Sequence, residues 1–164
     1  KTLLTEDKIQ LVCKSFVDAK GSMFLGRGFS YPIALEGALK LKELAYVHAE
    51  GYPAGEMKHG PLALIEDGMP VVVLAPRDEY FKKTISNMQE VIARGAKVLL
   101  ITNKSKDEVF HENIWQSIEV ENANDDLLPF LITIPLQKLA YHSALNKGYD
   151  IDKPRNLAKS VTVE

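Results

Sequence analysis

The feature that most constrains the fold of this chain is a continuous apolar, largely β-branched run from Val71 to Ala75. Such a run, without alternation between apolar and polar side chains, is typical of a strand that is covered on both faces of its sheet. Lys97 to Thr102 repeats the pattern, and shorter or weaker versions span Ser22 to Leu25 and Ser117 to Val120. These segments predict a sheet that lies buried between other layers.

Helical periodicity fills most of the intervals between the predicted strands. Helices are expected over Thr5 to Lys20, about Tyr31 to about Glu50, Asp78 to Ala93 and Leu127 to Asn146. Strands that alternate with helices are joined by crossover units, so the sheet should be largely parallel. The predicted fold class is α/β: a three-layer sandwich with a mostly parallel, flavodoxin-like central sheet. A single domain, residues 1–164, accounts for the chain and includes a polar tail from about residue 149.

Charge and composition exclude several classes of function. The 164 residues carry a net charge of −2, which provides no basic field to attract nucleic acid or an anionic membrane. Apolar runs such as Leu127 to Leu136 are too short or too interrupted to cross a bilayer. Cys13 is the only cysteine, and we expect a small buried residue rather than a reactive thiol. The absence of an intrachain disulfide and of a signal peptide predicts a reducing, cytoplasmic location.

A tight turn, Gly26-Arg27-Gly28, follows the first predicted strand, and Ser30 is placed to act as the N-cap of the next helix. Sheets of this kind bind ligands beyond the carboxyl ends of their strands, where backbone amides can hold an anion. The spacing matches neither a Rossmann nor a Walker loop. A glycine turn with a capping serine is therefore the favoured interpretation, and a phosphate site is the alternative.

The helix predicted after this turn has an apolar side and a charged side. The side expected to meet the sheet consists of Ile33, Ala34, Gly37, Ala38, Leu41, Ala45 and His48. On another side, Lys40 and Glu43 stand three residues apart, which makes their side chains neighbours. Spacing alone favours a solvated surface pair, and a catalytic pair is the alternative.

The segment from Gly51 to Pro61 contains three glycines and two prolines and predicts an ordered loop. His59 lies in this loop, where glycine and proline can fix the backbone. A lone loop histidine is more often structural or simply exposed than functional. His48, His111 and His142 show no metal-ligand spacing with it, so we expect neither a metal site nor a cofactor.

Three segments together resemble the glucosamine-6-phosphate synthase family. They are Glu36-Gly37-Ala38-Leu39-Lys40-Leu41-Lys42-Glu43, Glu56-Met57-Lys58-His59-Gly60-Pro61 and Pro154-Arg155-Asn156-Leu157-Ala158-Lys159-Ser160-Val161-Thr162-Val163-Glu164. The first two recur loosely among sugar isomerase (SIS) domains, whereas the third is far more specific. The similarity extends over nearly the whole chain, from about Ser22 to Glu164.

The resemblance implies that the chain is part of a larger enzyme. Members of the family carry a glutaminase domain followed by two SIS domains, and this chain matches only the second SIS domain. Because the chain also begins at Lys1 rather than at Met, we expect a fragment that is inactive without the glutaminase and the first lobe. The implied reaction converts fructose 6-phosphate and glutamine-derived ammonia to glucosamine 6-phosphate, in a homo-oligomer whose site is shared between subunits.

Four residues match positions that have roles in that family. Glu43 matches the carboxylate that moves a proton between C1 and C2 of the sugar, and Lys40 matches the lysine that handles nearby hydroxyl protons. His59 matches a histidine that helps to open the sugar ring from across a subunit boundary. Lys159 matches the lysine that forms a Schiff base with the ketose carbonyl, which makes the tail a strap over the site. Gly26 to Ser30 is only the counterpart of the phosphate-gripping loop in the first lobe.

Three other interpretations stay open. A regulatory domain that senses sugar phosphates would not need Glu43, Lys40 and Lys159 together, and it usually carries a DNA-binding helix-turn-helix. No basic recognition helix is present here. Another sugar isomerase or deglycase of the same fold should lack the tail that contains Lys159. A domain used only for assembly is the third interpretation.

Overall fold

The structure, a computed structural model, describes residues 5–103 and 114–157. Five strands form one sheet in which every neighbouring pair is parallel. In chain order the strands are β1 (Ser22–Gly26), β2 (Ala49–Pro53), β3 (Pro70–Leu74), β4 (Lys97–Asn103) and β5 (Gln116–Val120). Their order across the sheet, β2-β1-β3-β4-β5, is that of flavodoxin-like folds, which confirms the predicted fold class.

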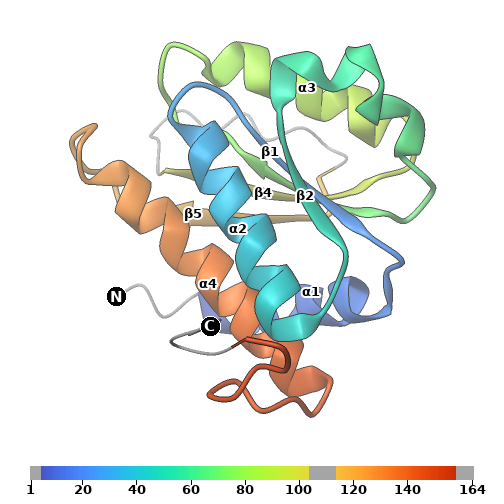
Figure 1. Cartoon of the computed structure of the whole chain (residues 1–164). Coiled ribbons are helices and arrows are strands. Elements are labelled where there is room, and N and C mark those ends of the chain that lie inside the picture. Colours follow the sequence, from blue (N-terminus) through green and yellow to red (C-terminus); the bar gives the residue numbers. More distant parts are fainter. Residues whose placement is uncertain (1–4, 104–113, 158–164) are drawn as a thin grey trace, which may run out of the picture.

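Helices cover both faces of this sheet (Figure 1). One face carries α1 (Thr5–Asp18), α2 (Ser30–Ala45) and α4 (Leu128–Asn146), and the other carries α3 (Phe81–Ile92). Two short 3-10 helices, η1 (Ala54–His59) and η2 (Pro61–Leu64), join the α3 side. The predicted loop over residues 51–61 therefore contains the end of β2 and all of η1.

Each face of the sheet contributes to its own apolar core, because successive side chains of a strand point to opposite faces. Val72 and Leu74 of β3 belong to the core under α1, α2 and α4. Val71 and Val73 belong to the core under α3. Every residue of β3 is buried, which explains why its sequence shows no alternation.

The predicted helix from Tyr31 to Glu50 is too long at its C-terminal end. Tyr46 takes a left-handed conformation with φ of 53°, so α2 ends there and the chain turns into β2. This edge strand was not predicted, because Gly51 and Pro53 are typical of loops. Proline is tolerated at the end of an edge strand, where its missing amide hydrogen is not needed. Gly51 is needed because a Cβ at this position would lie 3.0 Å from backbone atoms of Leu35 in α2.

The prediction that Ser30 is an N-cap is wrong. Ser30 is the first residue of α2, Phe29 takes the N-cap position, and no side chain caps the helix. The preceding turn satisfies the first amides instead: the N–H of Ser30 donates to the carbonyl of Arg27, and the N–H of Tyr31 donates to the carbonyl of Gly28. Backbone geometry, rather than a serine hydroxyl, therefore starts this helix.

Candidate functional site

The outer side of α2 carries a cluster of three charged side chains, Glu36, Lys40 and Glu43. The ammonium group of Lys40 donates a hydrogen bond to Glu43 Oε2 at 2.7 Å. Glu36 Oε1 lies 3.8 Å from the same nitrogen. The side chains of Lys40 and Glu43 are only 31% and 28% exposed, so the pair is partly shielded from water. The contact that the spacing of three residues predicts is present.

The cluster keeps Lys40 charged. Its hydrogen bond to Glu43 raises the pKa of Lys40, partial burial opposes this rise, and the negative charges of Glu36 and Glu43 add to it. Lys40 is therefore a stable cation that holds the Glu43 carboxylate in one place. A fixed carboxylate beside an ammonium group can take up and return a proton while the cation stabilises negative charge on a bound molecule.

The side of α2 that faces the sheet explains why the charged cluster points outward. Apart from Leu41, its buried residues are small: Ser30, Ala34, Gly37, Ala38 and Ala45. Gly37 permits the closest packing, because a Cβ there would lie 2.9 Å from Leu136 of α4 and from Phe24 of β1. His48, which the sequence places on this side, lies beyond the end of α2 and is exposed, so that assignment is wrong.

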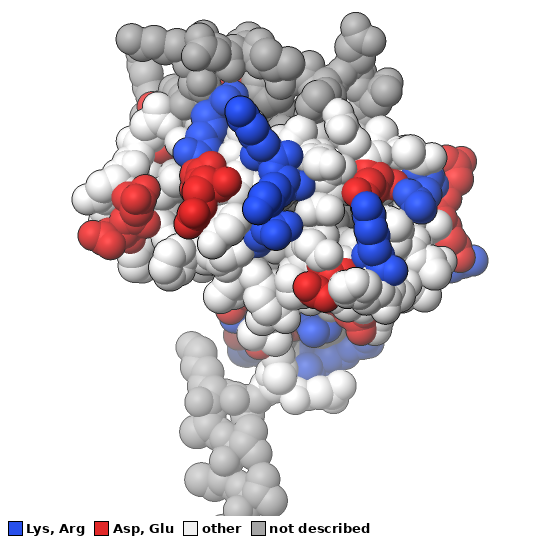
Figure 2. All heavy atoms as spheres, turned by 90° about the horizontal axis from the view of Figure 1, so that it is seen from above, with Lys and Arg blue, Asp and Glu red and all other residues white. Residues whose placement is uncertain are grey.

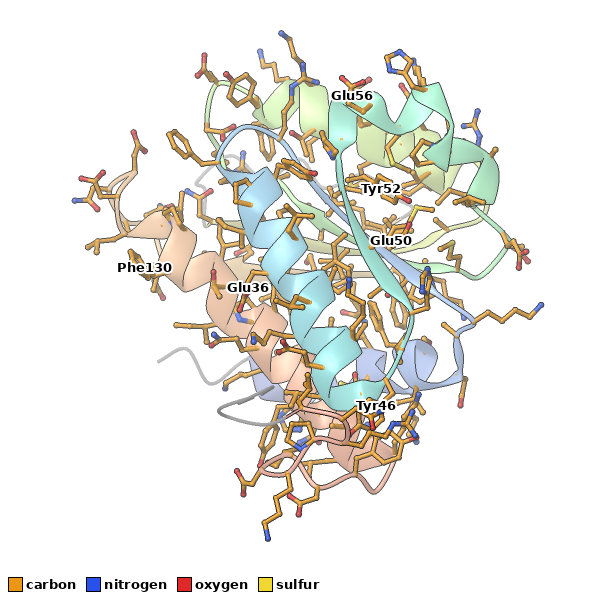
Figure 3. The ribbon with its side chains drawn as sticks, viewed as in Figure 1. Glu36, Tyr46, Glu50, Tyr52, Glu56 and Phe130 are labelled. Carbon is orange, nitrogen blue, oxygen red and sulfur yellow. The ribbon has the colours of Figure 1, made fainter. Side chains whose placement is uncertain are left out.

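His59 lies on the opposite side of the sheet from Lys40 and Glu43. It ends η1, which contacts α3, whereas α2 covers the other face. Figure 3 shows this separation: Glu56, which is in the same short helix as His59, lies far from Glu36, which is in the same helix as Lys40 and Glu43. The ring Nδ1 of His59 is 2.7 Å from Glu56 Oε2, and the side chain is 74% exposed. One copy of the chain therefore does not bring His59 to Glu43.

The described part of the C-terminal tail is fastened to the end of α2. The backbone N–H of Arg155 donates to the hydroxyl oxygen of Tyr46 at 2.7 Å. The guanidinium carbon of Arg155 lies 4.0 Å from the centre of the Tyr46 ring. The ring of Tyr149 packs against the same tyrosine, with 4.8 Å between ring centres. Tyr46 follows Glu43 by about one helical turn. Lys159 itself lies outside the described residues.

A cavity of about 430 Å³ opens beyond the carboxyl ends of β1 and β3. Phe29, Arg77, Tyr80 and Asp125 are among the residues that line it. Burial raises the pKa of Asp78 in the same wall, although backbone hydrogen bonds oppose the rise. The strand order reverses at this point, which is where ligands bind in sheets of this type. Sequence reasoning missed the loop after β3, because only the order of the strands reveals its position.

The turn over residues 26–30 is less suited to hold an anion than its glycines suggest. Anions bind at helix N-termini through free backbone amides. The amides of Ser30 and Tyr31 already donate to carbonyls within the turn, and Pro32 has no amide hydrogen. This geometry supports the favoured interpretation of a structural glycine turn.

A second cavity, of about 550 Å³, lies at the amino ends of the strands and is lined by residues such as His48, Glu50, Asp67 and Lys97. The charged cluster of α2 does not contribute to it. Within residues 5–103 and 114–157, no three His, Cys, Asp or Glu side chains are grouped to hold a metal ion. In the same part of the chain, no helix has the length and apolar character that a membrane span requires.

The chain resembles known proteins in both sequence and structure. Residues 15–147 match the SIS domain family. The chain is 54% identical over all 164 residues to the glutamine–fructose-6-phosphate aminotransferase (isomerizing) of Bartonella henselae, and covers 27% of that protein. The C-terminal domain of glucosamine-fructose-6-phosphate aminotransferase from Francisella tularensis has a TM-score of 0.86 at 48% identity, over 93% of this chain and 43% of that one.

A more distant solved structure, a glucosamine-6-phosphate deaminase from Thermotoga maritima, has a TM-score of 0.66 at 25% identity. The match covers 98% of this chain and 48% of the deaminase chain. The chain thus spans only 27% of the length of the Bartonella henselae relative and less than half of either solved chain.

Proposed function

This chain belongs to the SIS domain family, and from that premise we propose that it is the C-terminal lobe of the isomerase part of a glucosamine-6-phosphate synthase. The complete enzyme makes glucosamine 6-phosphate from fructose 6-phosphate and glutamine-derived ammonia. The observation that carries this proposal is the Lys40–Glu43 pair, in which the two side chains are 2.7 Å apart. Every residue of this chain falls within the part of such an enzyme that it matches.

Glu43 is assigned the proton transfer between C1 and C2 of the sugar. Conversion of a fructose imine to an amino aldose removes a proton from C1 and delivers one to C2. A single carboxylate within reach of both carbons can carry out both steps. The contact with Lys40 supports this role, because it fixes the carboxylate and supplies a positive charge beside the oxygen atoms that gain electron density.

Lys159 is assigned the Schiff base with the ketose carbonyl. This step needs a neutral amine in a site from which water is excluded. The fastening of Arg155 to Tyr46 supports the assignment, since Lys159 follows Arg155 by four residues and Tyr46 lies about one turn from Glu43. The tail then acts as a strap that retains ammonia over the sugar.

His59 is assigned to ring opening in the site of a neighbouring subunit. Because His59 and Glu43 lie on opposite faces of one copy, a shared site in a homo-oligomer would bring them together. The grip on the sugar phosphate and the hydrolysis of glutamine are assigned to parts of the polypeptide that precede this lobe.

The decisive experiment is deuterium exchange at C1 of fructose 6-phosphate in heavy water, followed by NMR. We expect exchange when the first SIS domain of the enzyme, here called the companion lobe, is supplied as well, and none with this chain alone. Glu43→Gln should lower the exchange rate by at least about 100-fold with little change in sugar binding. Glu36→Gln, which alters the neighbouring carboxylate of the cluster, is the matched control and should retain most of the exchange. Absence of exchange with both lobes folded and bound together would remove the catalytic proposal.

A second experiment tests the tail. Borohydride should trap fructose 6-phosphate on the two-lobe protein, and Lys159→Ala should abolish the trapped adduct, as measured by mass spectrometry. Lys153→Ala removes another exposed lysine of the same tail and should leave trapping unchanged. Trapping that persists in the Lys159 variant would show that a different lysine forms the imine.

The resemblance to a glucosamine-6-phosphate deaminase favours a second candidate, a different sugar-phosphate reaction on the same fold. At 25% identity it is much weaker than the 54% identity to the aminotransferase. The two candidates differ in the tail: only the synthase requires Lys159. A sensor domain, by contrast, would bind the sugar phosphate without catalysing exchange at C1.

A further inference from the structure

The cavity at the amino ends of the strands is separate from the charged cluster of α2. Its volume of about 550 Å³ is within the range of sites that bind small molecules. The residues that line it include the starts of β1, β3 and β4 and the segments that precede them. We call it the amino-end cavity. Strands of five to seven residues separate it from the carboxyl ends of the sheet, a distance of about 15 to 20 Å.

Ser22 contributes a buried polar group without a partner to the lining of this cavity. The residue is 2% exposed, and its Oγ makes no hydrogen bond within the described part of the chain. Its partner in β2 is Ala49, whose side chain cannot accept a hydrogen bond. A buried hydroxyl without a partner costs free energy, which a hydrogen bond to a bound molecule would recover. The hydroxyl of Ser22 therefore points to a ligand.

The charged side chains of the cavity favour a cation. Carboxylates outnumber ammonium groups among the lining residues. The carboxylates belong to Asp18, Glu50, Glu66 and Asp67, and the ammonium groups belong to Lys20 and Lys97. A concave site in which one sign of charge is in excess attracts ligands of the opposite sign.

Several of these charges have no counterpart in the protein. Across residues 5–103 and 114–157, Asp18, Lys20, Glu66 and Asp67 form no ion pair. The α3 side of the molecule is different. Figure 2 looks onto that side and shows basic and acidic side chains close to one another, and Lys58 Nζ lies 2.9 Å from Glu90 Oε1 there. The charges of the amino-end cavity thus stay available to a ligand.

Glu50 is held in place at the β2 edge of the cavity. The hydroxyl of Tyr52 donates to Glu50 Oε2, and His48 Nε2 lies 3.6 Å from Glu50 Oε1. Figure 3 shows Glu50 and Tyr52 next to each other on β2. A carboxylate that neighbouring side chains already orient loses little freedom when it accepts a further hydrogen bond.

We propose that the amino-end cavity binds a small hydroxylated amine, such as an amino sugar, at a site separate from the proposed catalytic pair. The excess of carboxylates would hold the ammonium group. Lys20, Lys97 and the hydroxyl of Ser22 would donate hydrogen bonds to hydroxyl oxygens of the ligand. Leu64 and Met69, which also line the cavity, offer apolar surface to its C–H groups.

Other classes of ligand fit this lining less well. In the part of the chain that the structure describes, no three His, Cys, Asp or Glu side chains are close enough together to hold a metal ion. A polyamine without hydroxyls would be repelled by Lys20 and Lys97 and would leave the Ser22 hydroxyl without an acceptor. A phosphate group would meet the excess of carboxylates. The proposal does not depend on the proposed function, because it uses none of the groups assigned to catalysis.

The test is a titration of the ¹⁵N-labelled chain with glucosamine, followed by ¹H–¹⁵N NMR below neutral pH, where the amine is charged. We expect saturable shifts at the amides around Ser22, Glu50 and Glu66, with a Kd of about 1 mM, as is usual for a ligand of this size. Glucose is the matched ligand, because it carries a hydroxyl where glucosamine carries the ammonium group. It should bind at least about tenfold more weakly.

Two variants test the assignment of the lining residues. Ser22→Ala should weaken glucosamine binding several-fold and leave stability in urea unchanged or higher, because the hydroxyl has no partner in the protein. A purely structural serine would lose stability instead. Glu66→Gln should also weaken binding several-fold, since it removes one negative charge. Glu79→Gln, an exposed glutamate that lines the other cavity, is the matched control and should bind as the wild type does.

Three results would overturn the proposal: no saturable binding of glucosamine at concentrations well above about 1 mM, equal affinities for glucose and glucosamine, or shifts that map to Lys40 and Glu43 and disappear in Glu43→Gln. The amide spectrum of each variant also shows whether it is folded. Binding that depends on Ser22 and Glu66, together with an absence of exchange at C1, would support this site while removing the proposed function.

Discussion

Cys13 illustrates, at the scale of one residue, how packing decides chemistry. The side chain is buried in the core between the sheet and the helices, and its Sγ lies 3.8 Å from the carbonyl oxygen of Leu139. Burial raises the pKa of this thiol to about 11. The thiol is therefore protonated at neutral pH, which confirms the expectation of a small buried residue and opposes nucleophilic reactivity.

The raised pKa of Cys13 predicts a loss of stability in alkali. The thiol ionises near pH 9.0 in the unfolded chain and near pH 11 in the folded chain. Its contribution to stability is therefore complete below about pH 9 and is lost as the pH rises towards 11, by up to about 3 kcal/mol. Urea unfolding across this range should give a shallower pH dependence for Cys13→Ala than for the wild type. Parallel curves would show that another group causes the loss.

The contact between Arg155 and Tyr46 predicts how firmly the tail is held. Arg155→Ala removes the guanidinium group that stacks on Tyr46, an interaction that contributes about 1 kcal/mol. Amide hydrogen–deuterium exchange in residues 149–156, measured by mass spectrometry, should then be several-fold faster. Arg94→Ala, on the exposed α3-side surface, is the control and should leave the rate of exchange in the tail unchanged. An unchanged rate in the Arg155 variant would mean that other contacts hold the tail.

Individual residues of the site differ in how far the sequence predicts their position. The contact between Lys40 and Glu43 follows from helical spacing, because both belong to one element. The position of His59 depends on which face of the sheet η1 covers, and helical spacing contains no such information. The fastening of the tail joins Tyr46 and Arg155, which are 109 residues apart, so local patterns do not reveal it.

At the scale of elements, the junction between β1 and α2 is the tightest constraint in the fold. A Cβ on Gly26 would overlap the carbonyl oxygen and carbon of Ser30 and the amide of Tyr31. The first turn of α2 therefore rests directly on the end of β1. This close approach fixes where α2 begins and thus which of its sides carries Lys40 and Glu43.

Gly26→Ala is expected to destabilise the fold by about 2 kcal/mol or more, because backbone atoms have to move to make room for the methyl group. Gly21→Ala is the matched control at the other end of β1. A Cβ there would meet nothing closer than the carbonyl of His48 at 3.5 Å, an ordinary contact. Urea unfolding should separate the two variants clearly. Equal stability would show that the junction relaxes without cost.

Elements with one dominant local sequence pattern were predictable, whereas an element that depends on pairing with a distant strand was missed. The uniform burial of β3 and the long apolar helix α4 follow directly from their local sequences. β2 contains Glu50, Gly51 and Pro53 and has little intrinsic preference for a strand. It forms because β1 pairs with it from Ser22↔Ala49 to Gly26↔Pro53.

At the scale of the whole molecule, the residues of the proposed site lie on two surfaces that are far apart within one copy of the chain. Glu43 and Lys40 lie on the outer side of α2, and His59 lies beyond the opposite face of the sheet. If His59 serves the site of a neighbouring subunit, each site in a symmetric dimer combines Glu43 from one subunit with His59 from the other. Such a division predicts complementation between two inactive variants.

Subunits that carry Glu43→Gln and subunits that carry His59→Ala should each form nearly inactive dimers, with the companion lobe present in both. After equal amounts are mixed and allowed to exchange, about half of the dimers are mixed, and each mixed dimer regains one of its two sites. Activity should therefore return to about a quarter of the wild-type value, measured as deuterium exchange at C1 of fructose 6-phosphate. If His59 acted within its own subunit, every site would still lack one group, and the mixture would stay inactive.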